Sequence, residues 1–279
     1  MTKSSFHKLL LGSVLMLLPF TVQAQVVLKN WTIEDHSGKV KILVSSDTLE
    51  ITAPDGLTLW YNQRLTGDYE IGYRVKMLMQ GGKYDRLSDL NCFWGANDPE
   101  YPDNLFARSE WRNGIFQHYK TLSLFYVGYG GNHNSTTRFR QYFAKAADTS
   151  DAIARPVIKE YTDKAHLLIP NKWYDIKIRV EKGITTYSVN GEELFRLPVK
   201  KNEGDGYFGL RLLENHTLFT GFQVKSLKRQ MQCFHPRKYR IKTVFDKSNI
   251  PLNYTQTPFN NPAQDISRIS IFLPVNKNH

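Results

Sequence analysis

The stretch Leu122–Tyr142 reads LSLFYVGYGGNHNSTTRFRQY and predicts two β-strands joined by a glycine-rich turn. Its first part, Leu122–Tyr129, is rich in the aromatic and β-branched residues that strands favour. Glycines then interrupt the pattern, and the short polar side chains of Asn132–Asn134 are typical of a turn. From Thr136 to Tyr142 apolar and polar residues alternate again, as in a half-buried strand.

The alternation in the second strand places its charges on one face. If Phe139 points into a core, Arg138 and Arg140 point away from it, because successive strand residues face opposite sides. Paired arginines suit planar anions such as carboxylate or sulfate. An ordinary solvated strand face beside a glycine turn is the alternative interpretation.

Strand-like segments separated by turn signals recur through some two hundred residues, and no helical period lasts beyond two or three turns. This pattern predicts an all-β fold, one antiparallel β-sandwich with a long loop and an irregular C-terminal extension. The expected strands are Trp31–Glu34, Lys39–Val44, Thr48–Thr52, Leu57–Tyr61, Tyr69–Met79, Ser88–Ala96, Tyr174–Glu181, Thr185–Val189, Glu193–Leu197, Tyr207–Leu213 and Leu218–Val224.

Turn residues mark where these strands should end. Pro54–Gly56 and Glu214–His216 predict turns, and Asn190-Gly191 predicts a type I′ hairpin. Ala144–Lys164 is expected to be irregular.

The strand pattern also lapses from Asn97 to Lys120, where Leu105–Trp111 predicts one or two helical turns. A loop this long is often functional. Its larger polar and aromatic side chains form either a rim over a binding face or plain solvent-exposed decoration; they are Arg108, Trp111, Arg112 and His118.

The two ends of the chain are expected to lie outside the sandwich. Residues 1–24 carry Lys3 and Lys8, an apolar run and small residues before Gln25, as in a secretory signal peptide. The sequence therefore predicts export to the periplasm or the extracellular space, with no transmembrane segment. Residues 25–229 are the predicted sandwich domain, and 230–279 a poorly ordered or loosely docked basic extension.

The net charge of +11 resides mainly in that extension. Nine basic residues but only two acidic ones follow Leu227, and between the signal and that point 26 basic residues face 24 acidic ones. A nearly neutral body argues against a nucleic-acid partner, while attraction of the extension to an acidic polymer stays open.

Two cysteines occur, and no CxxC, HExxH or Walker-type loop. Cys92 lies in a strand-like run and is most simply a small buried hydrophobe. An export compartment would permit a disulfide with Cys233, but the sequence does not fix their distance.

Six blocks of the sequence, in order, resemble a family of secreted bacterial proteins encoded in polysaccharide-utilisation gene clusters and long described only as a domain of unknown function. The blocks are SDLNCFWGANDPE, YVGYGGNHNSTTRFRQY, ARPVIKEYTD, LLIPNKWYDIKI, YSVNGEELF and GYFGLRLLENHTLFTGFQV. The resemblance covers about residues 25–227 and implies a concanavalin A-like jelly roll. One branch of such jelly rolls includes an ulvan oligosaccharide dehydratase, so the resemblance implies an acidic oligosaccharide or polysaccharide as partner.

The resemblance leaves four possible functions, and the residues of the sequence help to choose among them. Retaining jelly-roll glycosidases need two carboxylates about 5 Å apart, and no strand offers such a pair, which counts against hydrolysis. A carbon–oxygen lyase acting by β-elimination on a uronic acid, most simply a dehydratase of a terminal uronate, is the favoured hypothesis. A chain-cleaving polysaccharide lyase and a non-catalytic carbohydrate-binding module are the alternatives.

β-Elimination assigns roles to specific residues. Guanidinium groups must neutralise the uronate carboxylate while the C5 proton leaves, and a base near neutral pH, best a histidine, must take that proton. The catalytic candidates are His216 and His133 as base, Tyr126 or Tyr129 as acid at C4, and Arg138 in the clamp together with Arg140 and Arg211. The candidates for substrate binding are Arg140, Arg211, Asn91, Asn134, Tyr129 and Trp60. A solvated turn is the alternative for each histidine, and core packing for Tyr126 and Trp60.

No cofactor is required by this chemistry. The resemblance implies that a structural calcium is held by some such jelly rolls, and the acidic loop Asp98–Asp103 offers oxygen atoms without a recognisable ligand spacing.

Overall fold

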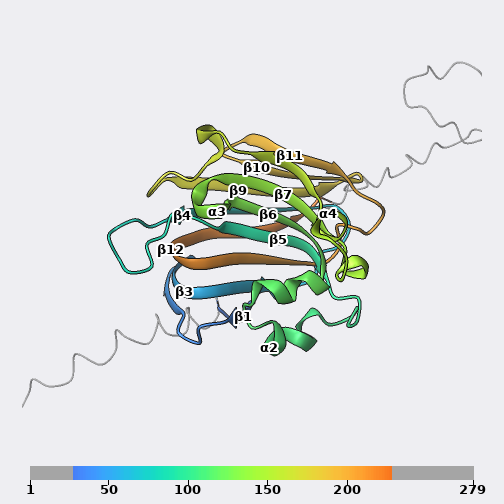
Figure 1. The fold of residues 1–279 in the computed structure, drawn as a ribbon, viewed down its shortest axis with the longest axis horizontal. Coiled ribbons are helices and arrows are strands. Elements are labelled where there is room, and N and C mark those ends of the chain that lie inside the picture. The colour runs from blue at the N-terminus through green and yellow to red at the C-terminus, as the bar shows by residue number, and fades with distance from the viewer. Residues whose placement is uncertain (1–27, 228–279) are drawn as a thin grey trace, which may run out of the picture. The chain divides into compact units, whose positions relative to one another are not determined.

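The structure is a computed structural model that describes residues 28–227. The predicted signal peptide (1–24), the basic extension (230–279) and Cys233 lie outside the described residues. The described chain is built from antiparallel strands, which confirms the predicted all-β jelly-roll class (Figure 1). No helix in this part of the chain is long and apolar enough to cross a membrane.

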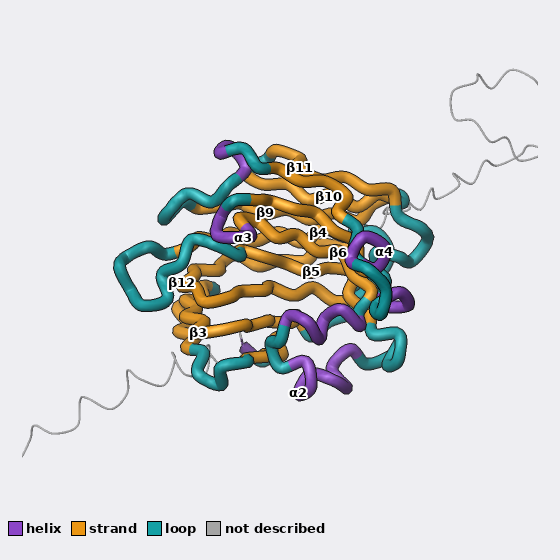
Figure 2. The backbone as a smooth tube through the Cα atoms, viewed as in Figure 1, coloured by secondary structure: helices purple, strands orange, loops and turns teal. Residues whose placement is uncertain are grey.

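The described residues contain twelve strands and seven short helical segments, joined by turns and loops. The strands are β1 (Trp31–Asp35), β2 (Lys41–Ser45), β3 (Thr48–Tyr61), β4 (Tyr69–Met77), β5 (Leu90–Asn97), β6 (Ser123–Gly130), β7 (Thr136–Tyr142), β8 (Val157–Tyr161), β9 (Trp173–Glu181), β10 (Ile184–Val189), β11 (Glu192–Pro198) and β12 (Tyr207–Ser226). The helical segments, drawn in purple in Figure 2, are η1 (Leu105–Arg108), α2 (Ser109–Arg112), η2 (Phe116–Thr121), α3 (Gly131–Asn134), η3 (Ala144–Ala146), α4 (Asp151–Ala154) and η4 (Lys164–His166).

Two long strands, β3 and β12, take part in both layers of the sandwich. The front sheet contains β1, the second half of β3, the first half of β12, and then β5, β6, β7 and β8. The back sheet contains β2, the first half of β3, the second half of β12, and then β4, β9, β10 and β11. The layers are therefore joined along hydrogen-bonded strands and not only by loops.

The crossing from one sheet to the other corrects two predicted turns. Pro54–Gly56 lies inside β3, and the pairing with β12 passes from Ala53–Asn215 to Gly56–Leu213. Between these pairs, Pro54 and Asp55 of β3 oppose the single residue Glu214 of β12, whose φ is +46°, so β3 carries the extra residue of a β-bulge. A bulge bends a strand and increases its twist, so proline and turn residues here redirect two continuing strands instead of ending four.

The core lies between the two layers. Trp94 of the front sheet stacks on Phe139 and also contacts Tyr187 of the back sheet, with ring centroids 5.5 and 6.3 Å apart. Its indole N–H donates to Thr185 Oγ1 at 2.8 Å, so its one polar group is satisfied. Cys92 lies in the same core, 1% exposed, which confirms that it is a buried hydrophobe.

Other local predictions fare unevenly. The hairpin at Asn190-Gly191 is confirmed, since both residues have positive φ as a type I′ turn requires. Helical turns form at η1 and α2 as expected, but η2 was not predicted. The expected irregularity of 144–164 is wrong in part, because Val157–Tyr161 pairs with β7 as the edge strand β8.

Candidate functional site

A pocket of about 390 Å³ opens on the outer face of the front sheet. Strands β5, β6, β7 and β12 form its floor, and the segments 116–120, 131–132 and 151–155 form its walls. Five of its side chains are basic and two are acidic, so the lining is cationic. The lining residues are Asp89, Asn91, Phe116, Gln117, Lys120, Tyr126, Gly128, Gly131, Asn132, Thr136, Arg138, Arg140, Tyr142, Asp151, Arg155, Arg211 and Leu213.

Strand periodicity brings five of the predicted site residues into this pocket: Asn91, Tyr126, Arg138, Arg140 and Arg211. Each stands on the strand face opposite the core, as the alternation predicted. The structure therefore places Arg138, Arg140 and Arg211 in the lining of one pocket.

Arg211 is the most deeply placed cation, 3% exposed at the start of β12. Its Nη1 donates to the backbone oxygen of Gly114 at 2.6 Å, and its guanidinium lies 5.6 Å from the ring centre of Phe116 and 5.5 Å from that of Tyr119. No ion pair to Arg211 forms among the described residues, and burial lowers its pKa from the usual value. A buried guanidinium without a carboxylate favours an anionic ligand.

Space for this guanidinium depends on a glycine. A Cβ added at Gly56 would lie 2.7 Å from Arg211 Nη2 and 2.3 Å from the Gly114 oxygen. Only glycine allows the three groups to approach so closely.

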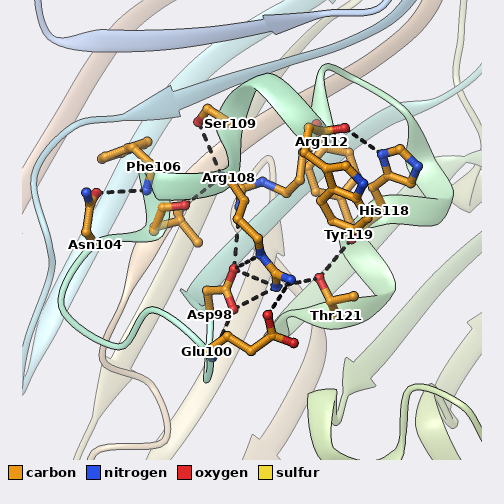
Figure 3. A network of polar contacts seen from close by, with 12 residues as sticks. Asp98, Glu100, Asn104, Phe106, Arg108, Ser109, Arg112, His118, Tyr119 and Thr121 are labelled. Carbon is orange, nitrogen blue, oxygen red and sulfur yellow. Dashed lines mark hydrogen bonds and ion pairs between the residues drawn. The ribbon is translucent and has the colours of Figure 1, made fainter.

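A buried ion-pair network holds the loop segment that contacts Arg211, and its Arg108–Asp98 part is drawn in Figure 3. Arg112, fully buried, donates to Glu34 Oε1 at 2.8 Å, and Tyr119 donates to Glu34 Oε2 at 2.6 Å. Arg108 donates through two nitrogens to Asp98, each at 2.8 Å. The network therefore fixes Gly114, Phe116 and Tyr119 around Arg211.

The long loop was expected to form either a rim over a binding face or solvent-exposed decoration, and neither interpretation describes its two arginines. Arg108 and Arg112 are structural and are not rim residues, and Trp111 stacks on His118 with ring centroids 4.1 Å apart. The loop does wall the pocket, but through Phe116, Gln117 and Lys120, which the sequence did not single out.

Tyr126 stands in the pocket between two arginines. Burial raises its pKa well above the usual value, the neighbouring Tyr142 and Asp89 raise it further, and Arg211 and Arg140 lower it. A Cβ at Gly128 would lie 2.8 Å from the Tyr126 hydroxyl, so this glycine leaves the floor open beside it. The hydroxyl is thus neutral at ordinary pH and able to donate a proton or a hydrogen bond.

Arg140 and Arg138 are engaged differently. Arg140 Nη1 donates to the backbone oxygen of Arg155 at 2.5 Å, and no carboxylate forms an ion pair with it among the described residues. Arg138, in contrast, is paired with Glu160 of the neighbouring strand β8. Of the two, Arg140 is the freer to meet an anion.

Acceptor groups accompany these cations. Asn91 is 4% exposed, and its Oδ1 is buried without a hydrogen-bond partner among the described residues. Asp89 also lines the pocket and accepts from Arg86 at 2.6 Å. A ligand that satisfies both kinds of group must carry an anion and also a donor such as a hydroxyl.

Neither predicted histidine lines the pocket. His216 lies on β12 just after the bulged pairing with β3, and its two ring nitrogens face Asp85 Oδ1 at 3.1 Å and Glu50 Oε1 at 2.9 Å. Both nitrogens are thereby occupied, so the ring holds loop 78–89 to the sheet and is not poised to accept a substrate proton. His133 lies exposed on the left-handed turn α3, with φ of +56°. The assignment of these side chains as pocket bases is wrong.

Three further predicted residues are structural. Tyr129 points into the core, where its ring meets Tyr174, because it lies three positions from Tyr126 on the same strand and so faces the other side. Trp60 is fully buried under the loop and stacks on Phe93. Asn134 accepts from the Leu168 N–H at 2.8 Å and donates to the Leu168 oxygen at 2.9 Å.

The acidic loop suggested for calcium does not fit that ion. Asp98 and Glu100 both accept from Arg108, whose guanidinium takes the carboxylate oxygens that a cation would need. Between residues 28 and 227 no group of three or more His, Cys, Asp or Glu side chains is arranged to hold a metal ion.

Arg155 is the most informative pocket residue that sequence reasoning missed. It follows α4, is 5% exposed, and pairs through Nη2 with Asp151. Its only sequence signal was the Arg155-Pro156 dipeptide in a stretch expected to be irregular. Packing of that stretch against β7 brings it to the pocket, and no local pattern encodes such a contact.

Comparison with known proteins assigns the chain to a family and shows which solved structures share its fold. A family model described as a domain of unknown function (DUF6250) matches residues 51–222. No curated protein matches the sequence significantly.

Solved structures share the fold at low identity. A protein of unknown function with a galectin-like fold from Bacillus subtilis is 15% identical, covering 73% of this chain and 92% of its own, with a TM-score of 0.55. The carbohydrate-binding module CBM66 from Bacillus subtilis is 13% identical over 71% and 96%, with a TM-score of 0.45. The VIP36 exoplasmic/lumenal domain is 12% identical over 71% and 84%, with a TM-score of 0.45. The first of these likenesses supports the jelly-roll fold alone.

Proposed function

Because the chain belongs to the DUF6250 family, whose function is unknown, its role has to be argued from its own pocket, and we propose that it binds an acidic carbohydrate there. The observation that carries this proposal is Arg211, a 3%-exposed guanidinium that lines the pocket and has no carboxylate partner among the described residues. A buried, unpaired charge is costly unless a counter-charge arrives. A uronate carboxylate provides that charge in planar form.

The rest of the lining favours a sugar over a simple anion. The buried Oδ1 of Asn91 has no hydrogen-bond donor among the described residues, and sugar hydroxyls supply such a donor whereas sulfate or chloride does not. Phe116, Tyr126 and Tyr142 add aromatic surface to the pocket, and aromatic rings pack against the C–H faces of sugars as they do against other apolar surface. The predicted export through residues 1–24 would bring such a protein to polysaccharides outside the cell and stays a prediction.

Binding is tested by calorimetry with uronate oligosaccharides and with neutral oligosaccharides of equal length. We expect wild type to bind only the uronates, and Arg211→Gln to lose at least about tenfold in affinity, since hydrogen bonds to charged groups contribute about 1.5–3 kcal/mol. Arg196→Gln is the matched control, because Arg196 pairs with Glu193 on β11 outside the pocket. Equal binding of neutral and acidic sugars, or no effect of Arg211→Gln, would sink the proposal.

A second candidate is β-elimination on the bound uronate. The observation in its favour is the neutral Tyr126 hydroxyl beside Arg211 and Arg140, which could protonate the oxygen leaving C4 while the guanidiniums stabilise the enolate-like intermediate. Neither His133 nor His216 lines the pocket, so the expected base for elimination is missing there. Binding is therefore favoured over catalysis.

Elimination is read from the product. It leaves an α,β-unsaturated uronate, which absorbs ultraviolet light, and mass spectrometry then separates loss of one water (dehydratase) from chain scission (lyase). Binding without any new chromophore assigns the protein to the non-catalytic class.

A further inference from the structure

The pocket contains a second buried guanidinium, that of Arg155, with hydrogen-bonding capacity left over. Its Nε and Nη1 are both buried and have no partner among the described residues, and only Nη2 is engaged, by Asp151. The residue is 5% exposed and lines the pocket. A buried donor without a partner costs about 1–3 kcal/mol, so two such donors on one arginine point to a ligand atom.

Further groups gather around Arg155. Its guanidinium lies 5.9 Å from the ring centre of Tyr142, and Arg140 donates to its backbone oxygen. Burial raises the pKa of Tyr142 to about 12, and the charges of Arg140 and Arg155 lower it. Lys120 lines the same pocket and forms no ion pair among the described residues.

These groups are distinct from those that hold Arg211. Arg211 is fixed by β12 and by the loop segment of Gly114, whereas Arg155 is fixed by the chain that follows α4. The rings of Tyr126 and Tyr142 are in contact, with centroids 5.8 Å apart. The charges of Arg140 and Arg211 lower the pKa of both hydroxyls. The single pocket therefore has two guanidinium centres with tyrosines next to them.

The charges around Arg155, the second guanidinium centre, are not balanced by the acidic side chains of the pocket. Asp89 is paired with Arg86, and Asp151, whose side chain is 67% exposed, satisfies one nitrogen of Arg155. One anionic group on a ligand would neutralise Arg211 but would leave Arg140 and Lys120 without a counter-charge, and Nε and Nη1 of Arg155 without an acceptor.

We infer that the pocket binds a carbohydrate bearing two anionic groups, a carboxylate at Arg211 and a second oxyanion, a sulfate ester or a further carboxylate, at Arg155. This inference rests on the proposed function and specifies its ligand class. Arg155, Arg140 and Lys120 form the second subsite, and Asp151 competes with the ligand for Arg155.

The test compares matched uronate oligosaccharides with and without one sulfate ester, and with one or two carboxylates, by calorimetry at fixed ionic strength. Wild type is expected to prefer the doubly anionic member of at least one pair by about tenfold or more, the equivalent of one charged hydrogen bond. Arg155→Gln should abolish that preference and leave singly anionic ligands nearly unaffected, whereas Arg211→Gln should weaken both.

Asp151→Asn gives a second, independent readout that does not depend on removing a buried side chain. It removes the carboxylate charge that competes with the ligand for Arg155, and the exposed Asp151 side chain has no other partner among the described residues. We expect it to tighten doubly anionic ligands selectively. Arg196→Gln again controls for the loss of a distant charge.

Different results would contradict the two-anion subsite and the proposed binding of acidic sugars. If uronates bind and Arg211→Gln weakens them, but no doubly anionic ligand is preferred or Arg155→Gln weakens both ligand classes equally, the two-anion subsite is wrong and acidic-sugar binding stands. If no acidic saccharide binds at all, both are wrong.

Discussion

Glu34 and Arg112 form an ion pair at 2.8 Å in which both side chains are 0% exposed. Breaking such a pair from one side leaves a buried charge and typically costs about 3–5 kcal/mol. We therefore expect Arg112→Met to lower the free energy of unfolding by an amount in this range, measured by chemical denaturation. Because the same network positions Gly114 and Phe116 beside Arg211, affinity for the acidic ligand should fall as well.

The matched control for this pair is Arg196→Gln, which removes an exposed arginine from its pair with Glu193. Exposed pairs contribute little to stability, so its unfolding midpoint should stay close to wild type. A midpoint for Arg112→Met equal to that of Arg196→Gln would contradict a structural role for the network.

Gly128→Ala is expected to damage binding more than folding. Its φ is not in the left-handed region, but the new Cβ would lie 2.8 Å from the Tyr126 hydroxyl and would push that ring into the pocket. Gly72→Ala on β4 is the control, since its Cβ would meet the Gln223 side chain at an ordinary 3.5 Å. Calorimetry should show a loss of affinity for the first variant only, and equal affinities would exclude Tyr126 from the ligand surface.

Tyr126→Phe separates binding from chemistry. Removing one neutral hydrogen bond should cost about 0.5–1.5 kcal/mol in affinity. If elimination takes place, the same change removes the proton donor to C4 and should abolish formation of the unsaturated product. Unchanged product formation in Tyr126→Phe would exclude Tyr126 as the acid.

Asp85 makes stability depend on acid pH. Burial by itself raises the pKa of this carboxyl, but hydrogen bonds from the N–H groups of Gln80 and Gly82, and from His216, outweigh it, so the pKa lies below the usual value. A carboxyl whose pKa is depressed by folding contributes stability above its unfolded pKa of about 3.9, and loses it as the pH falls through the folded pKa. Asp85→Asn should therefore be less stable than wild type at pH 7.

The measurement is the unfolding midpoint of both proteins over a series of pH values. The difference between wild type and Asp85→Asn should shrink as the pH drops below about 4, because wild type then also carries a neutral group there. A constant difference across the whole series would show that the substitution acts through packing and not through charge.

Period-two alternation predicted much of the fold and about half of the site. It placed Arg138 and Arg140 on the correct face because Phe139 between them marks the core side of β7, and Arg211 because Leu210 and Leu212 flank it. The same rule, applied consistently, would have excluded Tyr129, which differs from Tyr126 by an odd number of positions. Fold class follows from repeated local patterns, and such patterns were present throughout residues 31–226.

The residues that were missed depend on contacts between distant segments. Arg155 and Lys120 reach the pocket only because two irregular segments pack over the front sheet. The histidines were chosen for their chemistry, yet His216 finds Asp85 and Glu50, 131 and 166 positions away in sequence. The continuity of β3 through Pro54 was hidden for the same reason, since it depends on pairing with β12, where Pro54 and Asp55 oppose the single residue Glu214.

The twenty-residue strand β12 has a consequence for how tightly a ligand can be held. Arg211 stands in its first half, and its second half lies between β3 and β4 in the back sheet. A guanidinium carried by such a strand is preorganised, so little conformational entropy is lost when a sugar arrives. Phe219 lies on the same strand, in the core and outside the pocket lining, so substitutions there should reach Arg211 through the rigidity of β12 and not through contact with the ligand.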